Sequence, residues 1–366
     1  MRILFTGGGT GGHLYPLVAV AREIRKLYSK KDLEFFYLGP KDEYNAILLS
    51  QEEVCIKSIA SGKIRRYFSW QNIIDIAFNI PLGFMQAVFL LSKIKPNLVF
   101  SKGGSGSVPV CFAAKLLKIP LFIHESDVVP GFSNQIASKW ARKIFISFPK
   151  TEFFDPQNVV LTGNPIRVEI LEGSKEQAPV SQERSVLLFT GGSQGAEFLN
   201  DFVLRSLNIF LEEFEIVHSC GINNFRAVSS ESLAIIDKDK SKYYHLFSSI
   251  EENKLKHIYK ASDLVIARSG SGTIFEISAL GLPSILVPLP SSASDHQAKN
   301  AYAYSQTGAA IVMEQDNMTK NFFLEEVHHI FASQERLNIM REAAIGFSKP
   351  NAAKAIARNI LEYLML

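Results

Sequence analysis

The chain has 366 residues, of which 47% are hydrophobic and 20% are charged, and its formal net charge is +3. These values exclude a disordered or fibrous protein, and the length predicts two domains rather than one. The three cysteines, Cys55, Cys111 and Cys220, lie far apart without C-x-x-C spacing. We therefore expect neither a disulfide framework nor a zinc site, and a reducing cytoplasm fits this usage.

The chain opens with an apolar run that breaks into glycines before a helical pattern, ILFTGGGTGGHLYP at residues 3–16. A glycine-rich turn between a strand and a helix lets backbone N–H groups and the positive end of the helix dipole face an anion, most often a phosphate. The Walker pattern fails, because His13 stands where it requires lysine. The dinucleotide pattern G-x-G-x-x-G is met, but the next predicted strand, at 33–39, ends without the acidic residue that holds a ribose. Phosphate binding and a tight packing turn remain as interpretations.

Residues 61–91 combine basic and aromatic side chains with a long apolar stretch. This combination suits the interface of a lipid bilayer, and polar residues interrupt the apolar run, so we expect no membrane-spanning helix. The alternative is a pair of helices packed in the core with a solvated basic turn. If the stretch meets a membrane, the expected contact residues are Lys63, Arg65, Arg66, Phe68 and Trp70.

The opening pattern returns halfway along the chain, as LLFTGGSQGA at residues 187–196. Two further pairs of similar segments follow in the same order: NLVFSKGGSGSVP at 97–109 with DLVIARSGSGTIFE at 263–276, and IPLFIHES at 119–126 with LPSILVPLP at 282–290. Strand, glycine loop, helix and strand repeating in this order predict parallel sheets with helices on both faces. We therefore expect two Rossmann-like domains whose ligands lie at the carboxyl ends of the strands, in the crevice between the domains.

Glycine, asparagine and proline near residues 161–170 predict the domain boundary, so we expect a first domain at 1–162 and a second at 163–347. A helix at 348–366 is expected to return to the first domain. Residues 1–162 hold 20 lysines and arginines against 12 aspartates and glutamates, a net charge of +8, whereas the rest of the chain carries −5. A basic first domain fits an anionic partner, and the stretch at 61–91 indicates a membrane surface rather than nucleic acid.

Six motifs occur in one order from the first predicted strand to the last helix: GGTGGH at 8–13, GNPIR at 163–167, GGSQGA at 191–196, RSGSGTIFE at 268–276, GLPSILVP at 281–288 and DHQAKNA at 295–301. On these motifs the chain resembles the MurG family of N-acetylglucosaminyltransferases. The resemblance implies the GT-B fold, with two Rossmann-like, doubly wound α/β domains and an interdomain cleft. It also implies transfer of N-acetylglucosamine from UDP-N-acetylglucosamine to lipid I, undecaprenyl-pyrophosphoryl-MurNAc-pentapeptide, which forms lipid II in peptidoglycan synthesis. The transfer inverts the sugar carbon and requires no metal ion or other cofactor.

The resemblance implies that the second domain binds the UDP-sugar donor. Metal-free transfer has to stabilise the growing charge on the leaving diphosphate with backbone N–H groups and helix N-termini, which the glycine loops offer. Ser193 is expected to contact the diphosphate, Glu276 to accept hydrogen bonds from the ribose hydroxyls, and Gln297 to hold the sugar. Further donor contacts are expected from Arg167, Gly270, Ser271, Gly272, Thr273, Ile274 and Phe275, and the uracil is expected to pack on Phe247 or Ile250.

Inversion in one displacement needs a base for the attacking acceptor hydroxyl. His13 is the candidate, because a histidine with a pKa near neutrality suits proton transfer. Glu125, at the end of a predicted strand, is the alternative base. The first glycine loop is expected to bind substrate through Thr10, Gly11 and Gly12.

We therefore expect a peripheral enzyme at the cytoplasmic face of the cell membrane. Its expected partners are UDP-N-acetylglucosamine, lipid I and an anionic membrane surface, without nucleic acid. Two alternatives are a UDP-sugar 2-epimerase of the same fold, which needs no lipid, and a non-catalytic nucleotide-binding membrane module. The basic and aromatic stretch at 61–91 argues against the epimerase, and His13 argues against the inert module.

Overall fold

The structure is a computed structural model that describes residues 1–8, 11–30, 32–41, 49–62, 75–149, 153–181, 183–192 and 195–365. The chain divides into two compact units. Unit 1 comprises Met1–Ile166 and Lys349–Leu366, and unit 2 comprises Arg167–Ser348.

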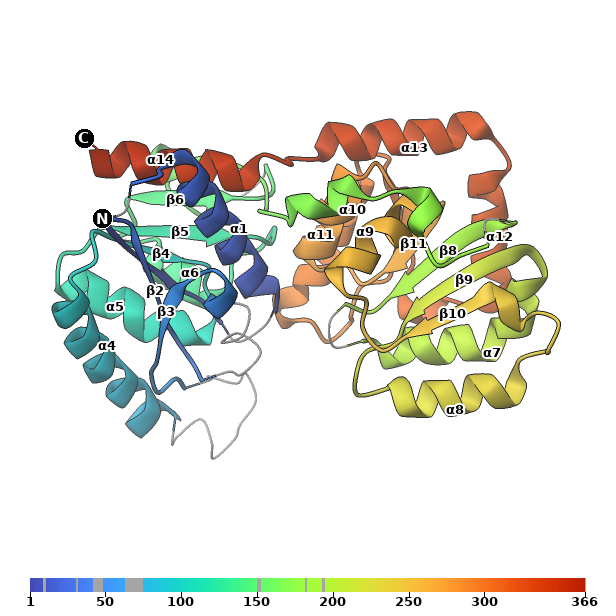
Figure 1. The fold of residues 1–366 in the computed structure, drawn as a ribbon, viewed down its shortest axis with the longest axis horizontal. Coiled ribbons are helices and arrows are strands. Elements are labelled where there is room, and N and C mark those ends of the chain that lie inside the picture. The colour runs from blue at the N-terminus through green and yellow to red at the C-terminus, as the bar shows by residue number, and fades with distance from the viewer. Residues whose placement is uncertain are drawn as a thin grey trace. The chain divides into compact units, whose positions relative to one another are not determined.

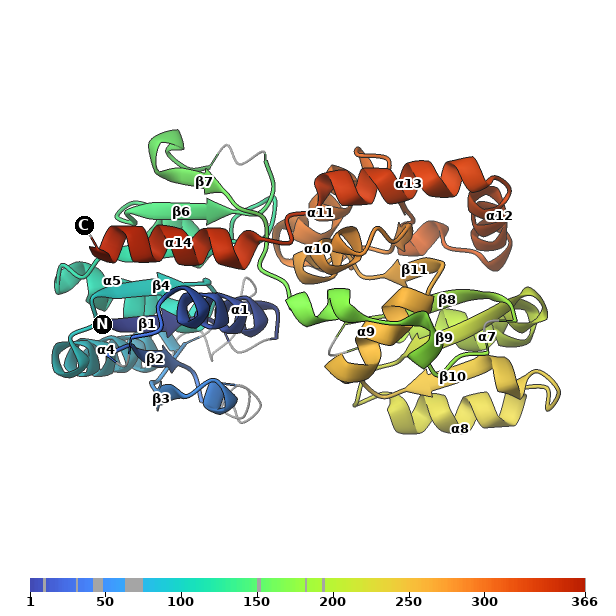
Figure 2. The ribbon, with the colours of Figure 1, turned by 45° about the horizontal axis from the view of Figure 1, so that its top comes forward.

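Unit 1 is built on a parallel sheet. In the described residues this sheet has seven strands in the order β3-β2-β1-β4-β5-β6-β7 (Figure 2). The strands are β1 (Arg2–Thr6), β2 (Glu34–Gly39), β3 (Val54–Ser58), β4 (Leu98–Ser101), β5 (Leu121–Glu125), β6 (Lys143–Ile146) and β7 (Val159–Leu161). All four residues of β4 are buried. Continuous burial of an apolar strand is typical of a parallel sheet that helices cover on both faces.

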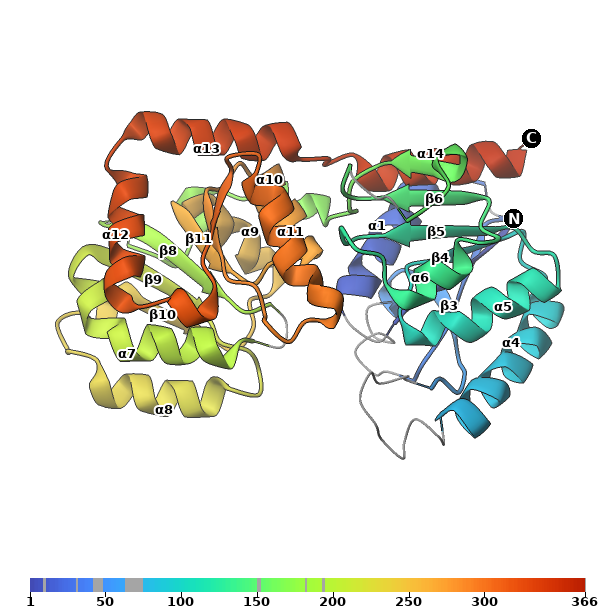
Figure 3. The same ribbon diagram turned by 180° about the vertical axis from the view of Figure 1, so that it is seen from behind.

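Two groups of helices cover the faces of this sheet. On one face, α1 (Gly11–Leu27) and α14 (Ala352–Met365) lie side by side and bury their apolar side chains (Figure 1). On the other face lie α4 (Ile80–Ile94), α5 (Val108–Leu116) and α6 (Phe132–Ala137) (Figure 3). Ile356 and Ile360 of α14 are fully buried, so the last helix of the chain is part of the core of unit 1.

Unit 2 repeats this architecture. Its sheet has six strands in the described residues, in the order β10-β9-β8-β11-β12-β13. The strands are β8 (Ser185–Thr190), β9 (Phe214–Ser219), β10 (Tyr244–Phe247), β11 (Leu264–Ala267), β12 (Ser284–Leu286) and β13 (Ala310–Val312). The helices are α7 (Glu197–Glu213), α8 (Phe225–Ile235), α9 (Glu252–Ala261), α10 (Ser271–Ala279), α11 (His296–Ser305), α12 (Lys320–Phe331) and α13 (Gln334–Phe347).

The core of unit 2 lies between its sheet and three of these helices, α7, α12 and α13. Phe189 of β8 stacks on Phe210 of α7 with ring centroids 6.2 Å apart, and Phe323 of α12 packs against both rings. Every pairing between described strands in the two units is parallel. The prediction of two doubly wound α/β units, with a last helix that returns to the first, is confirmed.

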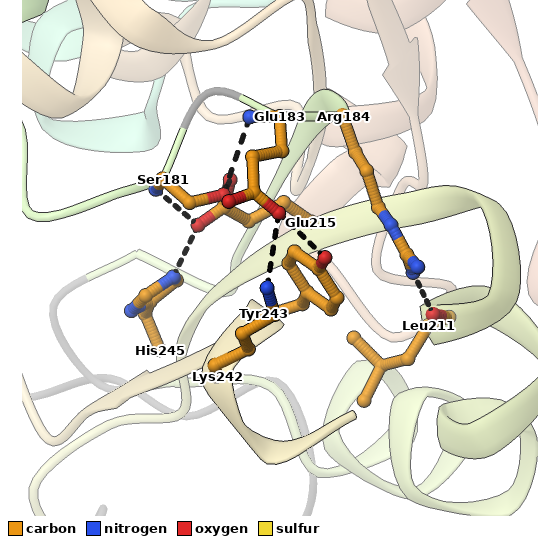
Figure 4. Close-up of polar contacts among 8 residues, drawn as sticks. All are labelled: Ser181, Glu183, Arg184, Leu211, Glu215, Lys242, Tyr243 and His245. Atoms are coloured by element: carbon orange, nitrogen blue, oxygen red, sulfur yellow. Dashed lines mark hydrogen bonds and ion pairs between the residues drawn. The ribbon is translucent and has the colours of Figure 1, made fainter. Parts of the chain in front are cut away.

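A polar cluster joins the amino ends of β8, β9 and β10 (Figure 4). Glu215 is fully buried, and its carboxylate accepts hydrogen bonds from the backbone N and Oγ of Ser181 at 2.6 and 2.9 Å. The same carboxylate lies 2.6 Å from Nε2 of His245. A buried carboxylate is tolerated only when such partners satisfy its oxygens. The cluster thus fixes the amino edge of the sheet.

Candidate functional site

The strand orders point to one place in each sheet where a ligand site is expected. In open parallel sheets, ligands bind beyond the carboxyl ends of the strands, at the point where the strand order reverses. This point lies between β1 and β4 in unit 1 and between β8 and β11 in unit 2. The loops that leave these four strands are the glycine loops identified in the sequence.

The two glycine loops of unit 1 pack backbone against backbone. Gly104 has a φ angle of +85°, and a Cβ atom there would lie 2.7 Å from Cα of Gly8. His13 lies beside both residues: its Nδ1 is 3.2 Å from the Cβ position of Gly8, and its Nε2 is 3.3 Å from that of Gly104. A side chain at either glycine would displace the imidazole or separate the loops. The two glycines therefore determine the position of the imidazole of His13, the candidate base.

The environment of His13 keeps its ring uncharged at neutral pH. Burial lowers the pKa of His13 to about 4, the positive charge of Lys102 acts in the same direction, and Asp127 opposes both. The expected pKa near neutrality is therefore wrong for the unliganded protein. A neutral imidazole can accept a proton, as a base must, but a pKa this low makes it a weak base.

Glu125, the alternative base, is tied into its own loop. It is 4% exposed, and its carboxylate accepts hydrogen bonds from the backbone N of Asp127 and of Gly131, both at 3.0 Å. The side-chain amide of Asn134 donates a third, at 2.8 Å. Burial and the charge of Asp127 raise the pKa of Glu125. With three donors on its oxygens, Glu125 holds the loop after β5 in place, which favours His13 as the base.

Lys102, which the sequence analysis did not select, belongs to the same site. It follows β4 directly and is 2% exposed, and its backbone N donates a 2.9 Å hydrogen bond to the carbonyl of Thr6 at the end of β1. The sequence feature that could have identified Lys102 is its position in SKGGSGS, between a predicted strand and a glycine turn.

In unit 2, the amino end of α10 is open to a ligand. Gly270 caps this helix, and among the described residues a Cβ atom at Gly270 or Gly272 would meet no atom within 4 Å apart from the helix backbone and the adjacent residues. The first turn holds no acidic residue, so the positive end of the helix dipole is not offset there. Ile274 and Phe275 are 0% and 1% exposed. Their side chains belong to the core, so the expectation that these two residues line the donor site stays a prediction that concerns their backbone.

Glu276, expected to hold the ribose, is paired with Arg167. Nε and Nη2 of Arg167 donate to Oε1 of Glu276 at 3.0 and 2.7 Å, and the hydroxyl of Tyr259 donates to Oε2 at 3.3 Å. A longer ion pair of 3.8 Å joins Arg167 to Glu252 of α9. The structure thus brings two expected donor residues together and adds Tyr259, which the sequence analysis did not identify.

Gln297 lies in the first turn of α11, shortly after Ser294 and Asp295, whose φ angles are +57° and +55°. Its side-chain oxygen accepts a 3.0 Å hydrogen bond from the backbone N of Leu289, and its backbone oxygen accepts one from Ser269. Gln297 therefore joins the loops that follow β11 and β12. The two candidates for the uracil contact, Phe247 and Ile250, are both half-buried, so exposure does not separate them.

Several expected site residues lie outside the described residues: Thr10, Ser193, Lys63, Arg65, Arg66, Phe68 and Trp70. Gly11 and Gly12 are the first two residues of α1.

The described part of the 61–91 stretch presents an apolar face on α4 and the turn before it. This face consists of Phe78, Leu82, Met85 and Phe89, which are 69%, 44%, 60% and 67% exposed and recur at helical spacing. The opposite side, with Gly83, Ala87 and Leu91, is buried, and the helix packs on α5. By length and composition alone, Ala77–Ile94 is also long and apolar enough to cross a membrane. The expectation that it does not span stays a prediction.

Comparison with known proteins identifies the class to which this fold and these sites belong. Residues 3–146 match the glycosyltransferase family 28 N-terminal domain, and residues 186–356 match the glycosyltransferase family 28 C-terminal domain. The chain is therefore a glycosyltransferase of family 28, with the GT-B arrangement of two Rossmann-like units.

Relatives that match nearly the whole chain show to which group within glycosyltransferase family 28 it belongs. A Clostridium tetani protein named "UDP-N-acetylglucosamine--N-acetylmuramyl-(pentapeptide) pyrophosphoryl-undecaprenol N-acetylglucosamine transferase" is 34% identical over 341 residues, 92% of this chain and 91% of its own length. The crystal structure of Acinetobacter baumannii MurG matches with a TM-score of 0.75 and 27% identity and covers 99% of both chains. The chain belongs to the MurG family, as its motifs predicted.

The fold alone does not separate this family from epimerases. A UDP-GlcNAc 2-epimerase from Neisseria meningitidis bound to UDP-GlcNAc matches with a TM-score of 0.69 and 16% identity, over 99% of this chain and 100% of its own. At this identity the likeness shows a shared fold and no more.

We predict that His13 titrates with a midpoint of about 4 in the unliganded protein, against about 6.5 for an ordinary histidine. The Lys102→Met variant removes the positive charge that lowers this pKa, so its midpoint should rise, while burial keeps it below the ordinary value. NMR titration of the imidazole signals measures both midpoints.

The same depression predicts a stability effect. The unfolded chain binds this proton at a higher pH than the folded protein does. Through His13, the free energy of unfolding should therefore decrease as the pH falls from about 6.5 to about 4. A midpoint near 6.5 in the parent protein would contradict burial as the cause.

Proposed function

We propose that this protein transfers N-acetylglucosamine from UDP-N-acetylglucosamine to lipid I with inversion at the sugar carbon, and so forms lipid II. The observation that carries the proposal is its likeness, over nearly the whole chain, to proteins named for this transfer. The epimerase alternative is supported only by the shared fold.

Unit 2 binds the donor in this proposal. The diphosphate of the donor lies at the amino end of α10, where the backbone of Gly270, Ser271, Gly272 and Thr273 faces it. The first turn of this helix holds no acidic residue that would repel the diphosphate. As the bond to the sugar breaks, negative charge grows on the departing UDP, and fixed N–H dipoles stabilise it without reorganisation. Ser193 adds a contact to the diphosphate and Gln297 a contact to the sugar.

Unit 1 binds the acceptor. His13 takes the proton from the attacking hydroxyl, for which its neutral ring at physiological pH is the required form. Gly11 and Gly12 present the amino end of α1 to the acceptor, together with Thr10. Glu125 is a positioning residue, because its hydrogen bonds hold the neighbouring loop.

We predict that the purified protein, incubated with labelled UDP-N-acetylglucosamine and lipid I, forms a labelled disaccharide lipid. Because the base is needed only for chemistry, His13→Ala should lose turnover by about 100-fold or more while it still binds UDP. Release of epimerised sugar from the donor alone would support the epimerase instead. UDP binding without any product from lipid I would leave only a binding module.

Glu276→Gln should weaken the binding of UDP by about 1–3 kcal/mol, because the ribose hydroxyls would lose a charged acceptor. Titration calorimetry with UDP measures this loss without lipid. The matched control is Glu252→Gln, which removes the longer partner of Arg167 and should change UDP affinity little. An equal fall in acceptor affinity in Glu276→Gln would instead indicate damage to the fold.

The apolar face of Phe78, Leu82, Met85 and Phe89 holds unit 1 on the anionic inner surface of the cell membrane. Its exposure on a helix whose other side is buried supports a helix that lies in the interface plane. Cations add about 1 kcal/mol each near such a surface, so the contact is reversible and weakened by salt. From the sequence, Lys63, Arg65, Arg66, Phe68 and Trp70 are proposed as further membrane contacts.

We predict that Met85→Glu/Phe89→Glu lowers sedimentation with anionic vesicles at least tenfold, because burial of each apolar side chain in the interface contributes about 1.5 kcal/mol or more. Turnover of lipid I in vesicles should slow, and turnover of a short-chain soluble acceptor should not. The matched control is Ile222→Glu/Leu233→Glu, which changes two apolar residues of unit 2 that are at least as exposed as Met85 and Phe89. Unchanged sedimentation of the α4 variant would mean that the membrane meets another face.

A further inference from the structure

A buried histidine of unit 2, His218, lies one residue before the carboxyl end of β9 and has no part in the chemistry described above. It is 1% exposed, and both nitrogen atoms of its ring are hydrogen-bonded. Its Nδ1 atom lies 2.9 Å from the hydroxyl of Tyr244 in β10, and its Nε2 atom lies 3.0 Å from Oδ1 of Asn200 in α7. The imidazole therefore joins two strands and a helix inside the unit.

Every hydrogen bond in this network has a fixed direction. Burial lowers the pKa of His218 to about 3, so the ring is neutral at physiological pH and carries one proton. The side-chain amide of Asn200 donates to the backbone carbonyl of Cys220 at 3.0 Å, so Oδ1 of Asn200 is the acceptor of the next bond. The proton of His218 is therefore on Nε2, and Nδ1 accepts from the hydroxyl of Tyr244.

The last acceptor of the network, the carbonyl of Cys220, contacts the glycine loop that follows β8. Gly195 has a φ angle of +77°, and a Cβ atom there would lie 2.2 Å from this carbonyl oxygen, so the two backbones pack closely. The side-chain amide of Asn224 donates a second hydrogen bond to the same oxygen, at 3.0 Å. The backbone N of Gly195 in turn donates to the carbonyl of Gly192 at 3.0 Å. A shift of the Cys220 carbonyl would therefore move Gly195.

Stability alone does not explain this network. A buried polar side chain pays a cost of desolvation that an apolar side chain of similar size does not, and its hydrogen bonds at best offset that cost. What the network adds is direction, because each group fixes the orientation of the next. Since it ends on the carbonyl that contacts Gly195, it determines the position of that residue.

We propose that His218 is a positioning residue of the donor site, which acts through Asn200 and the Cys220 carbonyl to hold Gly195 in place. The inference rests on the proposed function, in which the motif that contains Gly195 contacts the donor diphosphate through Ser193. A site that is already ordered binds its ligand with a smaller loss of conformational entropy. Without the donor on Nε2, the amide of Asn200 loses the partner that orients it, and the Cys220 carbonyl loses a fixed hydrogen bond.

The test uses two substitutions that each keep one nitrogen position of the ring. His218→Gln places an amide near the position of Nε2 and keeps a donor for Asn200, whereas His218→Asn keeps only an acceptor for Tyr244. Titration calorimetry with UDP measures the donor site without lipid. His218→Asn should weaken UDP binding about 10-fold, and His218→Gln should bind UDP within about twofold of the parent. In the transferase assay, His218→Asn should raise the KM for UDP-N-acetylglucosamine and leave the KM for the acceptor unchanged.

The matched control is His245→Asn, the same change at a half-buried histidine of the same unit. His245 bonds the buried carboxylate of Glu215 at the amino ends of the strands (Figure 4). Loss of this partner should lower the melting temperature, because the carboxylate stays buried, but UDP affinity should not change. If His245→Asn weakens UDP binding as much as His218→Asn does, general damage to unit 2 is the cause and the role of His218 is overturned.

Nitrogen-15 NMR of the imidazole determines the tautomer directly. In the parent, His218 should be protonated on Nε2 and unprotonated on Nδ1 at every pH between about 5 and 8. Tyr244→Phe removes the hydroxyl that fixes this tautomer and keeps the Nε2 donor available, so it should weaken UDP binding less than His218→Asn does. A parent ring that carries its proton on Nδ1 would contradict the direction of the network and overturn the inference.

The outcomes separate this inference from the proposed function. UDP binding that depends on His218, in a protein that transfers no sugar to lipid I, would refute the proposed function and keep the positioning role. An active His218→Asn variant with the UDP affinity and the donor KM of the parent would overturn the role of His218 and leave the proposed function standing. Equal losses of UDP affinity in His218→Asn and His218→Gln would show that the bond from Nε2 is not the cause, which also overturns the role.

Discussion

The backbone contact between Gly8 and Gly104 is the constraint on which the rest of unit 1's site depends. It joins the loops that leave β1 and β4, the two strands on either side of the point where the strand order reverses. Because neither residue has a side chain, the loops approach closely enough to fix the imidazole of His13 beside both. Loss of solvation at this ring is the main reason that its pKa is low.

The fold could be predicted from the sequence because its signals are local. Apolar strands buried on both faces, as in β4 and β8, give continuous hydrophobic runs, and each run ends in a glycine loop before a helix. The contact of Arg167 with Glu276 could not be predicted in this way, since 109 residues separate the two and no local pattern joins them. The burial of the Ile274 and Phe275 side chains could not be predicted for another reason: a motif names residues but does not say which face of the helix each occupies.

Electrostatics was the least predictable property of the candidate site. The identity of His13 is visible in the sequence, but its pKa depends on burial and on the charge of Lys102, 89 positions away in the chain. Lys102 lies in the motif SKGGSGS, whose glycines indicate a backbone turn rather than a charged site. Within the described residues, its burial and the absence of a hydrogen-bonding partner for its Nζ atom distinguish it from the solvated lysines of the basic first half.

The two units use the same backbone scheme for different side-chain chemistry. In unit 2 the open helix end of α10 lies in the unit that holds the Arg167–Glu276 pair, whose charges offset one another. In unit 1 the corresponding edge carries Lys102, which has no hydrogen-bonded counter-ion among the described residues, and His13, whose basicity this cation reduces.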